Sequence, residues 1–225
     1  MAGIYVCEDV AAADRLVRTL FRDVAPRTVR ERIARHAQGL REAHANGDTV
    51  AAVHLKNWHP DFVGSGTNEI MSASLTIDDT KHCLAREYGF ADWNDVEHRG
   101  HVVPDEAFES AVDDLVTGNE SALRQRLDKS PGLVTLRSSY GHAATLLHYV
   151  GSNGVETHRQ KVPANLPAIT RLLLDRGADA NAVASMYGGN TTTLSLLRTS
   201  AHPKDAGVFE ATERVLLDAD TEDRG

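Results

Sequence analysis

Apolar residues recur three or four positions apart along most of this chain, which is the spacing of residues on one face of a helix. Clear stripes of this kind cover residues 13–21, 29–40 and 108–116. No long segment alternates apolar and polar residues, which would be the pattern of a half-buried strand. The hydrophobic pattern therefore predicts an all-α protein.

Several predicted helices carry recognisable end signals. Thr28 with Glu31, and Thr76 with Asp79, have the spacing of a capping box, in which each side chain binds the backbone amide of the other residue. Gly89 occupies a position typical of the left-handed residue that follows a helix. These signals predict two helix starts and one helix end.

The helical pattern is interrupted at two places. Residues 61–75 are expected to form a loop, and residues 100–104 (Gly-His-Val-Val-Pro) are the best candidate for a domain boundary. We therefore expect an N-terminal helical region over residues 1–100 and a second part over residues 105–225.

Two short segments recur in the second part, roughly 45 residues apart. Residues 145–148 (Thr-Leu-Leu-His) are echoed by residues 192–195 (Thr-Thr-Leu-Ser), and residues 172–175 (Leu-Leu-Leu-Asp) by residues 215–218 (Val-Leu-Leu-Asp). Self-similarity at a fixed period predicts stacked units that bury a common core.

These segments resemble the ankyrin repeat. Residues 145–148 are similar to the Thr-Pro-Leu-His start of that repeat, and residues 172–182 are similar to its second helix and Gly-Ala-Asp-x-Asn-Ala turn. The residues that carry the resemblance are Thr145, Leu147, His148, Gly177, Ala178, Asp179 and Asn181. The resemblance implies an ankyrin-like α-solenoid of about three helix-pair repeats behind the N-terminal helical region.

Two single residues have expected local roles in such a repeat. His148 is expected to hold the turn backbone through hydrogen bonds, and Gly177 is expected to supply a positive φ or a close approach. Residues 85–93 also resemble a helical lead-in that precedes these repeats in some bacterial ankyrin proteins.

The repeats here are longer than the ~33 residues usual for an ankyrin repeat. The excess lies between the two helices of a unit, at residues 155–163 and 199–208. Insertions of this kind map to loops on one face, which is often the binding face. Two interpretations stay open: tolerated surface loops, or loops that carry function.

Composition and charge exclude several classes. The 225 residues carry a net charge of −8, which argues against a general nucleic-acid binder. No apolar run is long enough to span a membrane, and no basic segment begins a signal peptide. Cys7 and Cys83 are too few for a disulfide framework, so a cytoplasmic location is expected.

Motifs for catalysis or cofactor binding are absent. There is no nucleotide-binding glycine motif and no serine-nucleophile motif. The eleven histidines include His98 and His101 at ligand-like spacing, but no cysteine or acidic pair completes a set. We therefore expect no enzyme activity, no metal and no cofactor.

The function expected from the resemblance is non-catalytic protein–protein interaction through a concave groove and its turn fingers. The candidate partner-binding residues are Tyr140, Arg159, Met186, Tyr187 and His202. The alternative is an enzyme or small-molecule-binding protein, with a pocket formed by the long insertions and by His142, His158 and His202. A third alternative is dimerisation through the N-terminal helices.

Overall fold

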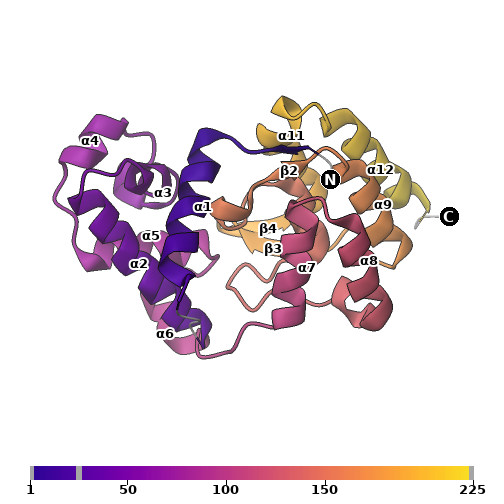
Figure 1. Ribbon diagram of the computed structural model, residues 1–225, viewed down its shortest axis with the longest axis horizontal. Coiled ribbons are helices and arrows are strands. Elements are labelled where there is room, and N and C mark those ends of the chain that lie inside the picture. The colour runs from indigo at the N-terminus through magenta and orange to yellow at the C-terminus, as the bar shows by residue number, and fades with distance from the viewer. Residues whose placement is uncertain (1–2, 24–26, 223–225) are drawn as a thin grey trace.

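A computed structural model describes the backbone of residues 3–23 and 27–222. The molecule has two parts that lie side by side, with the N-terminal helices at one end and the chain's second half at the other (Figure 1). Most described residues are helical, in agreement with the predicted all-α class. None of the helices in the described ranges combines the length and apolar character that crossing a bilayer requires.

The N-terminal part consists of helices joined by short turns. They are α1 (Glu8–Phe21), α2 (Val29–Ala45), α3 (Val50–Trp58), η1 (Pro60–Phe62), α4 (Thr67–Ser72), α5 (Ile77–Glu87) and α6 (Trp93–Arg99). Both predicted capping boxes are present, at Thr28 with Glu31 and at Thr76 with Asp79. Gly89 has a φ of +79°, as its place after α5 requires.

The predicted loop over residues 61–75 is wrong, because η1 and α4 occupy much of it. Ile70 of α4 is fully buried, and its carbonyl oxygen lies 2.9 Å from His44 Nε2 on α2. One buried apolar side chain is enough to hold a helix too short to show periodicity in sequence.

The second half consists of shorter helices that follow one another in pairs. They are α7 (Glu106–Val116), α8 (Glu120–Lys129), η2 (Pro131–Val134), η3 (Leu146–Gly151), η4 (Thr157–Arg159), α9 (Leu166–Asp175), α10 (Thr193–Thr199), α11 (His202–Asp205) and α12 (Phe209–Glu222). Helix α7 packs against η3, and η3 packs against α10. Helix α9 packs against α12, so these helices share a core.

Short strands, which the hydrophobic pattern did not predict, form two antiparallel pairs. Strand β1 (Ile4–Tyr5) pairs with β2 (Val162–Pro163), and β3 (Val183–Met186) pairs with β4 (Gly189–Thr192). The β3–β4 hairpin projects toward the N-terminal helices (Figure 1). Two- to four-residue strands show no periodicity in sequence, so only their pairing reveals them.

The first predicted insertion, residues 155–163, is buried rather than exposed. Its η4 turn packs against α1, which runs between the two parts (Figure 1), and its β2 strand pairs with β1. Lys161 Nζ lies 2.9 Å from Asp14 Oδ1 of α1. The interpretation of this segment as a tolerated surface loop is therefore wrong, because the N-terminal part covers it.

The hydrophobic interior forms two clusters. The first gathers buried residues between Val29 and Val96 and also includes Tyr140. The second gathers buried residues between Phe108 and Leu216. The chain passes from the first cluster to the second near residues 100–104. Tyr140 of the second half nevertheless packs in the first cluster, so the two parts share an interface.

Candidate binding cleft

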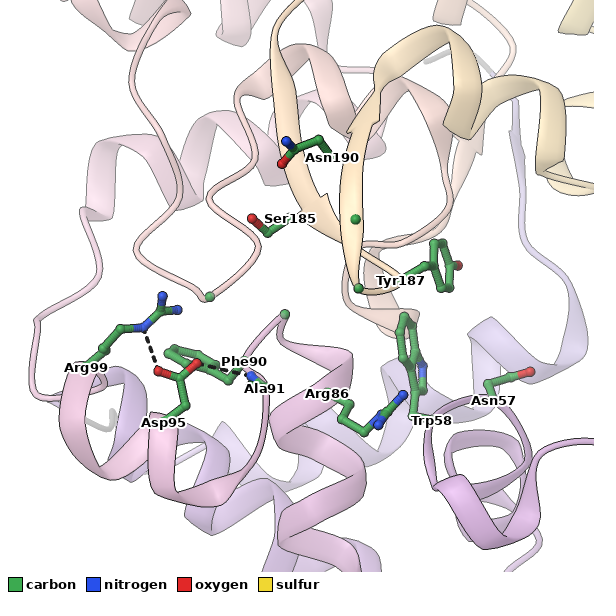
Figure 2. Close-up of a pocket in the computed structure, with 14 residues that line it drawn as sticks. Asn57, Trp58, Arg86, Phe90, Ala91, Asp95, Arg99, Ser185, Tyr187 and Asn190 are labelled. Atoms are coloured by element: carbon green, nitrogen blue, oxygen red, sulfur yellow. Dashed lines mark hydrogen bonds and ion pairs between the residues drawn. The ribbon is translucent and has the colours of Figure 1, made fainter.

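A cleft of about 480 Å³ lies between the β3–β4 hairpin and the N-terminal helices α3, α5 and α6 (Figure 2). The hairpin contributes Ser185, Tyr187 and Asn190, and the helices together with the turn between α5 and α6 contribute residues from the opposite side. Those residues are Asn57, Trp58, Arg86, Phe90, Ala91, Asp95 and Arg99. The cleft therefore exists only because the two parts of the chain pack together.

The hairpin turn places an aromatic side chain at the edge of this cleft. Tyr187 and Gly188 both have positive φ, +54° and +78°, as a tight two-residue hairpin turn requires. A left-handed conformation is unfavourable for a tyrosine, at a cost of about 1–3 kcal/mol. The side chain is 60% exposed. An exposed aromatic ring on a strained turn is an arrangement typical of binding sites.

Tyr187 is oriented by contacts on both of its ends. Its ring stacks on Trp58, with 5.3 Å between ring centroids and 4° between the planes (Figure 2). Its hydroxyl donates to Asn153 Oδ1 and accepts from the Gly154 amide at 3.0 Å. Trp58 itself is 7% exposed at the end of α3. The pair forms a rigid aromatic wall.

The cleft holds two guanidinium groups, of which one has a carboxylate partner and the other has none among the described side chains. Arg99 Nε lies 3.0 Å from Asp95 Oδ1, and its guanidinium lies 5.0 Å from the Phe90 ring centroid. Arg86 is exposed and forms no ion pair with any side chain that the structure describes. In Figure 2, Arg86 extends from α5 toward Trp58, below Tyr187. The cleft therefore presents one compensated cation and one uncompensated cation.

The deep side of the cleft is a backbone contact between two glycines. The His142 amide donates to the Tyr88 carbonyl at 3.3 Å. A Cβ placed on Gly89 would lie 2.2 Å from the His142 nitrogen, and one on Gly141 would lie 2.5 Å from the Gly89 carbonyl carbon. Only glycine permits this approach. This contact positions α5, and with it Arg86, against the second half.

The five predicted partner-binding residues do not share one surface. Tyr187 is exposed in the cleft, whereas Tyr140, Arg159 and Met186 are 3%, 5% and 2% exposed. His202 is half-buried beside Tyr5, and it lines a second hollow of about 350 Å³ behind the Trp58–Tyr187 pair. The predicted single groove is therefore not formed. Of the three aromatic and apolar candidates Tyr140, Met186 and Tyr187, only Tyr187 is exposed, and its neighbours in the cleft come from the N-terminal part.

The three buried candidates are buried for identifiable reasons. Tyr140 lies against Tyr88, with 4.9 Å between ring centroids, because the N-terminal part covers its turn. Arg159 lies in the buried insertion and pairs with Glu109 at 2.7 Å. Met186 faces the second core cluster. The sequence did not show that the N-terminal part covers this face of the second half.

The alternative pocket built on His142, His158 and His202 is likewise not assembled. His142 is fully buried and His158 is 7% exposed, and neither lines the described hollows. In the described residues no group of three or more histidine, cysteine or acidic side chains is placed to hold a metal ion.

The residues that resemble a repeat motif occupy local structural positions. His148 Nδ1 accepts a hydrogen bond from the Thr145 amide at 3.1 Å, and burial together with Arg137 lowers the pKa of His148 to about 4. Gly177 has a φ of +90°. Asp179 Oδ1 accepts from the Asn181 amide at 2.8 Å. Leu147 is fully buried, and Ala178 packs against the second cluster.

The sequence pattern did not indicate that Trp58 and Arg86, the other main residues of the cleft, belong to a candidate binding site. Both lie on helices of the N-terminal part, where the spacing of apolar residues identifies a helix but not the partner of its exposed face. The only local signal was an aromatic residue at a helix end two positions before Pro60.

Comparisons with known proteins add no assignment. No protein-family profile, no curated protein and no solved structure matches this chain.

Proposed function

We propose that this chain is a non-catalytic protein-binding module whose second half is an ankyrin-like solenoid of about three helix-pair repeats. The order of packing supports this proposal, with α7, η3 and α10 side by side and α9 against α12. The positive φ of Gly177 and the Thr145–His148 contact support it further. The N-terminal part then serves as a cap that covers the turn at Tyr140, residues 155–163 and the β3–β4 hairpin.

The binding surface we propose is the cleft of Figure 2, and its occupant is an extended acidic segment of a partner protein. The single observation that carries this is the uncompensated Arg86 beside the Trp58–Tyr187 wall. Tryptophan, tyrosine and arginine are the residue types that most often dominate binding energy at interfaces. Arg86 supplies charge complementarity, and Ser185 and Asn190 supply hydrogen-bonding groups along the hairpin.

A protein partner in the cytoplasm is consistent with the remaining properties of the chain. The net charge of −8 disfavours a nucleic-acid phosphate backbone as partner. Cys7 and Cys83 are both free thiols, which supports a reducing compartment.

A display library of random short peptides, screened with the full chain, tests the proposal. We expect enrichment of peptides that combine acidic and aromatic residues, because the cleft combines a free cation with an aromatic wall. A labelled peptide of the enriched sequence then reports affinity by fluorescence polarisation. Arg86→Glu and Tyr187→Ala should each weaken binding by about tenfold or more.

The matched control is Arg124→Glu, an exposed arginine on α8 that lies outside the cleft. This variant should bind the peptide like the wild type. Selection of basic peptides, or peptide binding that neither cleft variant weakens, would show that the cleft is not the binding surface.

A further inference from the structure

A third cavity, of about 640 Å³, lies where α1 and α2 meet α7, and it shares no residue with the cleft. Phe21, Val103 and Pro104 form apolar walls, and Arg32, Glu109 and Arg159 supply charged groups. It is formed by both parts of the chain and by the segment that connects them. A molecule bound here would contact all three.

One wall of this cavity is formed by an ion cluster around the buried Arg159, in which negative charge is in excess and the Asp113 side chain is 66% exposed. Arg159 lies 2.7 Å from Glu109 Oε2, 3.1 Å from Asp113 Oδ1 and 3.3 Å from Glu156 Oε1. One guanidinium therefore faces three carboxylates. The second oxygen of Glu109, Oε1, is buried and has no hydrogen-bond partner.

Arg32 presents the opposite charge from α2. Its guanidinium stacks 4.7 Å from the centroid of the Phe21 ring, and it forms no ion pair with any side chain in the described ranges. Its Nε is buried without a hydrogen-bond partner. Burial alone would lower the pKa of Arg32, but Tyr140, Tyr88 and Glu109 act on it electrostatically and raise it. A covered guanidinium N–H without an acceptor is still unfavourable.

The side chains of Arg32 and Glu109 both line this cavity, although Arg32 Nε and Glu109 Oε1 themselves are covered. The Arg32 guanidinium favours a carboxylate, which accepts two parallel hydrogen bonds from it. The Glu109 carboxylate favours an ammonium group, which supplies a donor and the charge that the three carboxylates lack. A simple anion would be repelled by these carboxylates, and a simple cation would be repelled by Arg32 and Arg159.

We propose that this cavity binds a small zwitterion, a free apolar L-α-amino acid. The carboxylate pairs with Arg32, the ammonium group pairs with Glu109, and the apolar side chain packs against Phe21 and Val103. The proposal is independent of the peptide cleft, because the two sites share no residue.

Isothermal titration calorimetry of the full chain with L-leucine tests this directly, with L-methionine and L-phenylalanine as further probes. N-acetyl-L-leucine lacks the ammonium charge, and L-leucine methyl ester lacks the carboxylate. We expect both to bind about tenfold or more weakly than L-leucine, because each leaves one buried charge unpaired. Equal binding of all three forms, or no binding of any probe at millimolar concentration, would overturn the proposal.

Two variants locate the site. Arg32→Met should reduce L-leucine affinity by about tenfold or more. The matched control is Arg35→Met, because Arg35 is exposed on the same helix and donates to the Leu20 carbonyl. Val103→Trp fills the mouth of the cavity from a side chain that is 68% exposed, so it should block binding without loss of stability. Wild-type affinity in both Arg32→Met and Val103→Trp would place any bound amino acid elsewhere.

Discussion

Glu87 is the most constrained charge at the interface between the two parts. It is fully buried on α5, with Oε2 2.6 Å from His54 Nδ1 and Oε1 accepting the Thr157 amide at 2.9 Å. Burial alone would raise the pKa of Glu87, but His54, His36 and the Thr157 amide together lower it. One carboxylate thus joins α3, α5 and the buried insertion.

Replacing this carboxylate should be strongly destabilising. Glu87→Ala leaves the His54 ring and the Thr157 amide buried without a partner, and breaking a buried pair costs about 3–5 kcal/mol. The control is Glu97→Ala, whose partner Arg30 is 36% exposed, and an exposed pair adds little to stability. Urea unfolding followed by circular dichroism measures both. Equal losses in the two variants would contradict the role assigned to Glu87.

Buried neutral histidines make the fold sensitive to acid. Burial, helped by His54, lowers the pKa of His36 from 6.5 to about 3, and burial with Arg137 lowers the pKa of His148 to about 4. Between these values and pH 6.5 the unfolded chain binds protons that the folded protein does not. Stability is therefore complete above pH 6.5 and falls as the pH drops, by about 1.4 kcal/mol per pH unit for each histidine.

The free energy of unfolding, measured with urea at pH 7 and at pH 5, checks this dependence. We expect a loss of at least about 2 kcal/mol at pH 5. His36→Gln removes one of the titrating groups and should reduce the slope, whereas His98→Gln, at an exposed position on α6, should keep it. A wild-type protein equally stable at both pH values would show that these histidines are not held neutral.

At the scale of elements, the end of α5 and the turn before η3 meet through their backbones. Gly141→Ala would place a Cβ 2.5 Å from the Gly89 carbonyl carbon and 2.6 Å from the Phe90 nitrogen. Both are backbone atoms, which cannot move aside as the end of a flexible side chain can. The two segments must move apart, which costs about 1–3 kcal/mol. Because Gly89 and Gly141 line the cleft, the same movement should weaken peptide binding.

Gly132→Ala is the matched control, since no atom lies within 4 Å of a Cβ at that position. It should change stability by about 0.5 kcal/mol or less. Thermal unfolding of both variants measures the difference. A Gly141→Ala protein as stable as Gly132→Ala would contradict the close packing of these two segments.

For the whole molecule, the second half is not independent of the first. Strand β2 pairs with β1, η4 packs against α1, and Tyr140 belongs to the cluster of the N-terminal part. Removal of residues 1–100 would expose Glu156 and Arg159, which are buried in the full chain. It would also remove Asp14, the ion-pair partner of Lys161.

A fragment of residues 105–225 should therefore unfold at lower urea concentration than the full chain and with a less steep transition. Mixing it with a fragment of residues 1–104 should restore part of the stability. Circular dichroism and the dispersion of amide signals in NMR spectra measure both effects. A fragment as stable as the full chain would show that the two parts are separate folding units.

The sequence by itself determined the local features of this protein. Helix stripes, the capping boxes at Thr28 and Thr76, and the turns at Gly89 and Gly177 all depend on residues three or four positions apart, so their signals survive without tertiary structure. It also indicated Tyr187 as an exposed turn residue, because a hairpin or finger tip is marked by its neighbouring glycines.

Only the tertiary structure decided which surfaces remain free. The stacking of Trp58 on Tyr187, the burial of residues 155–163 beneath α1, and the cavity that brings Arg32 toward Glu109 all join residues far apart in the chain. Periodicity shows that a helix face is apolar, but not which element covers it. The residues proposed to bind a partner are brought together by the packing of the two parts, and no local pattern encodes that packing.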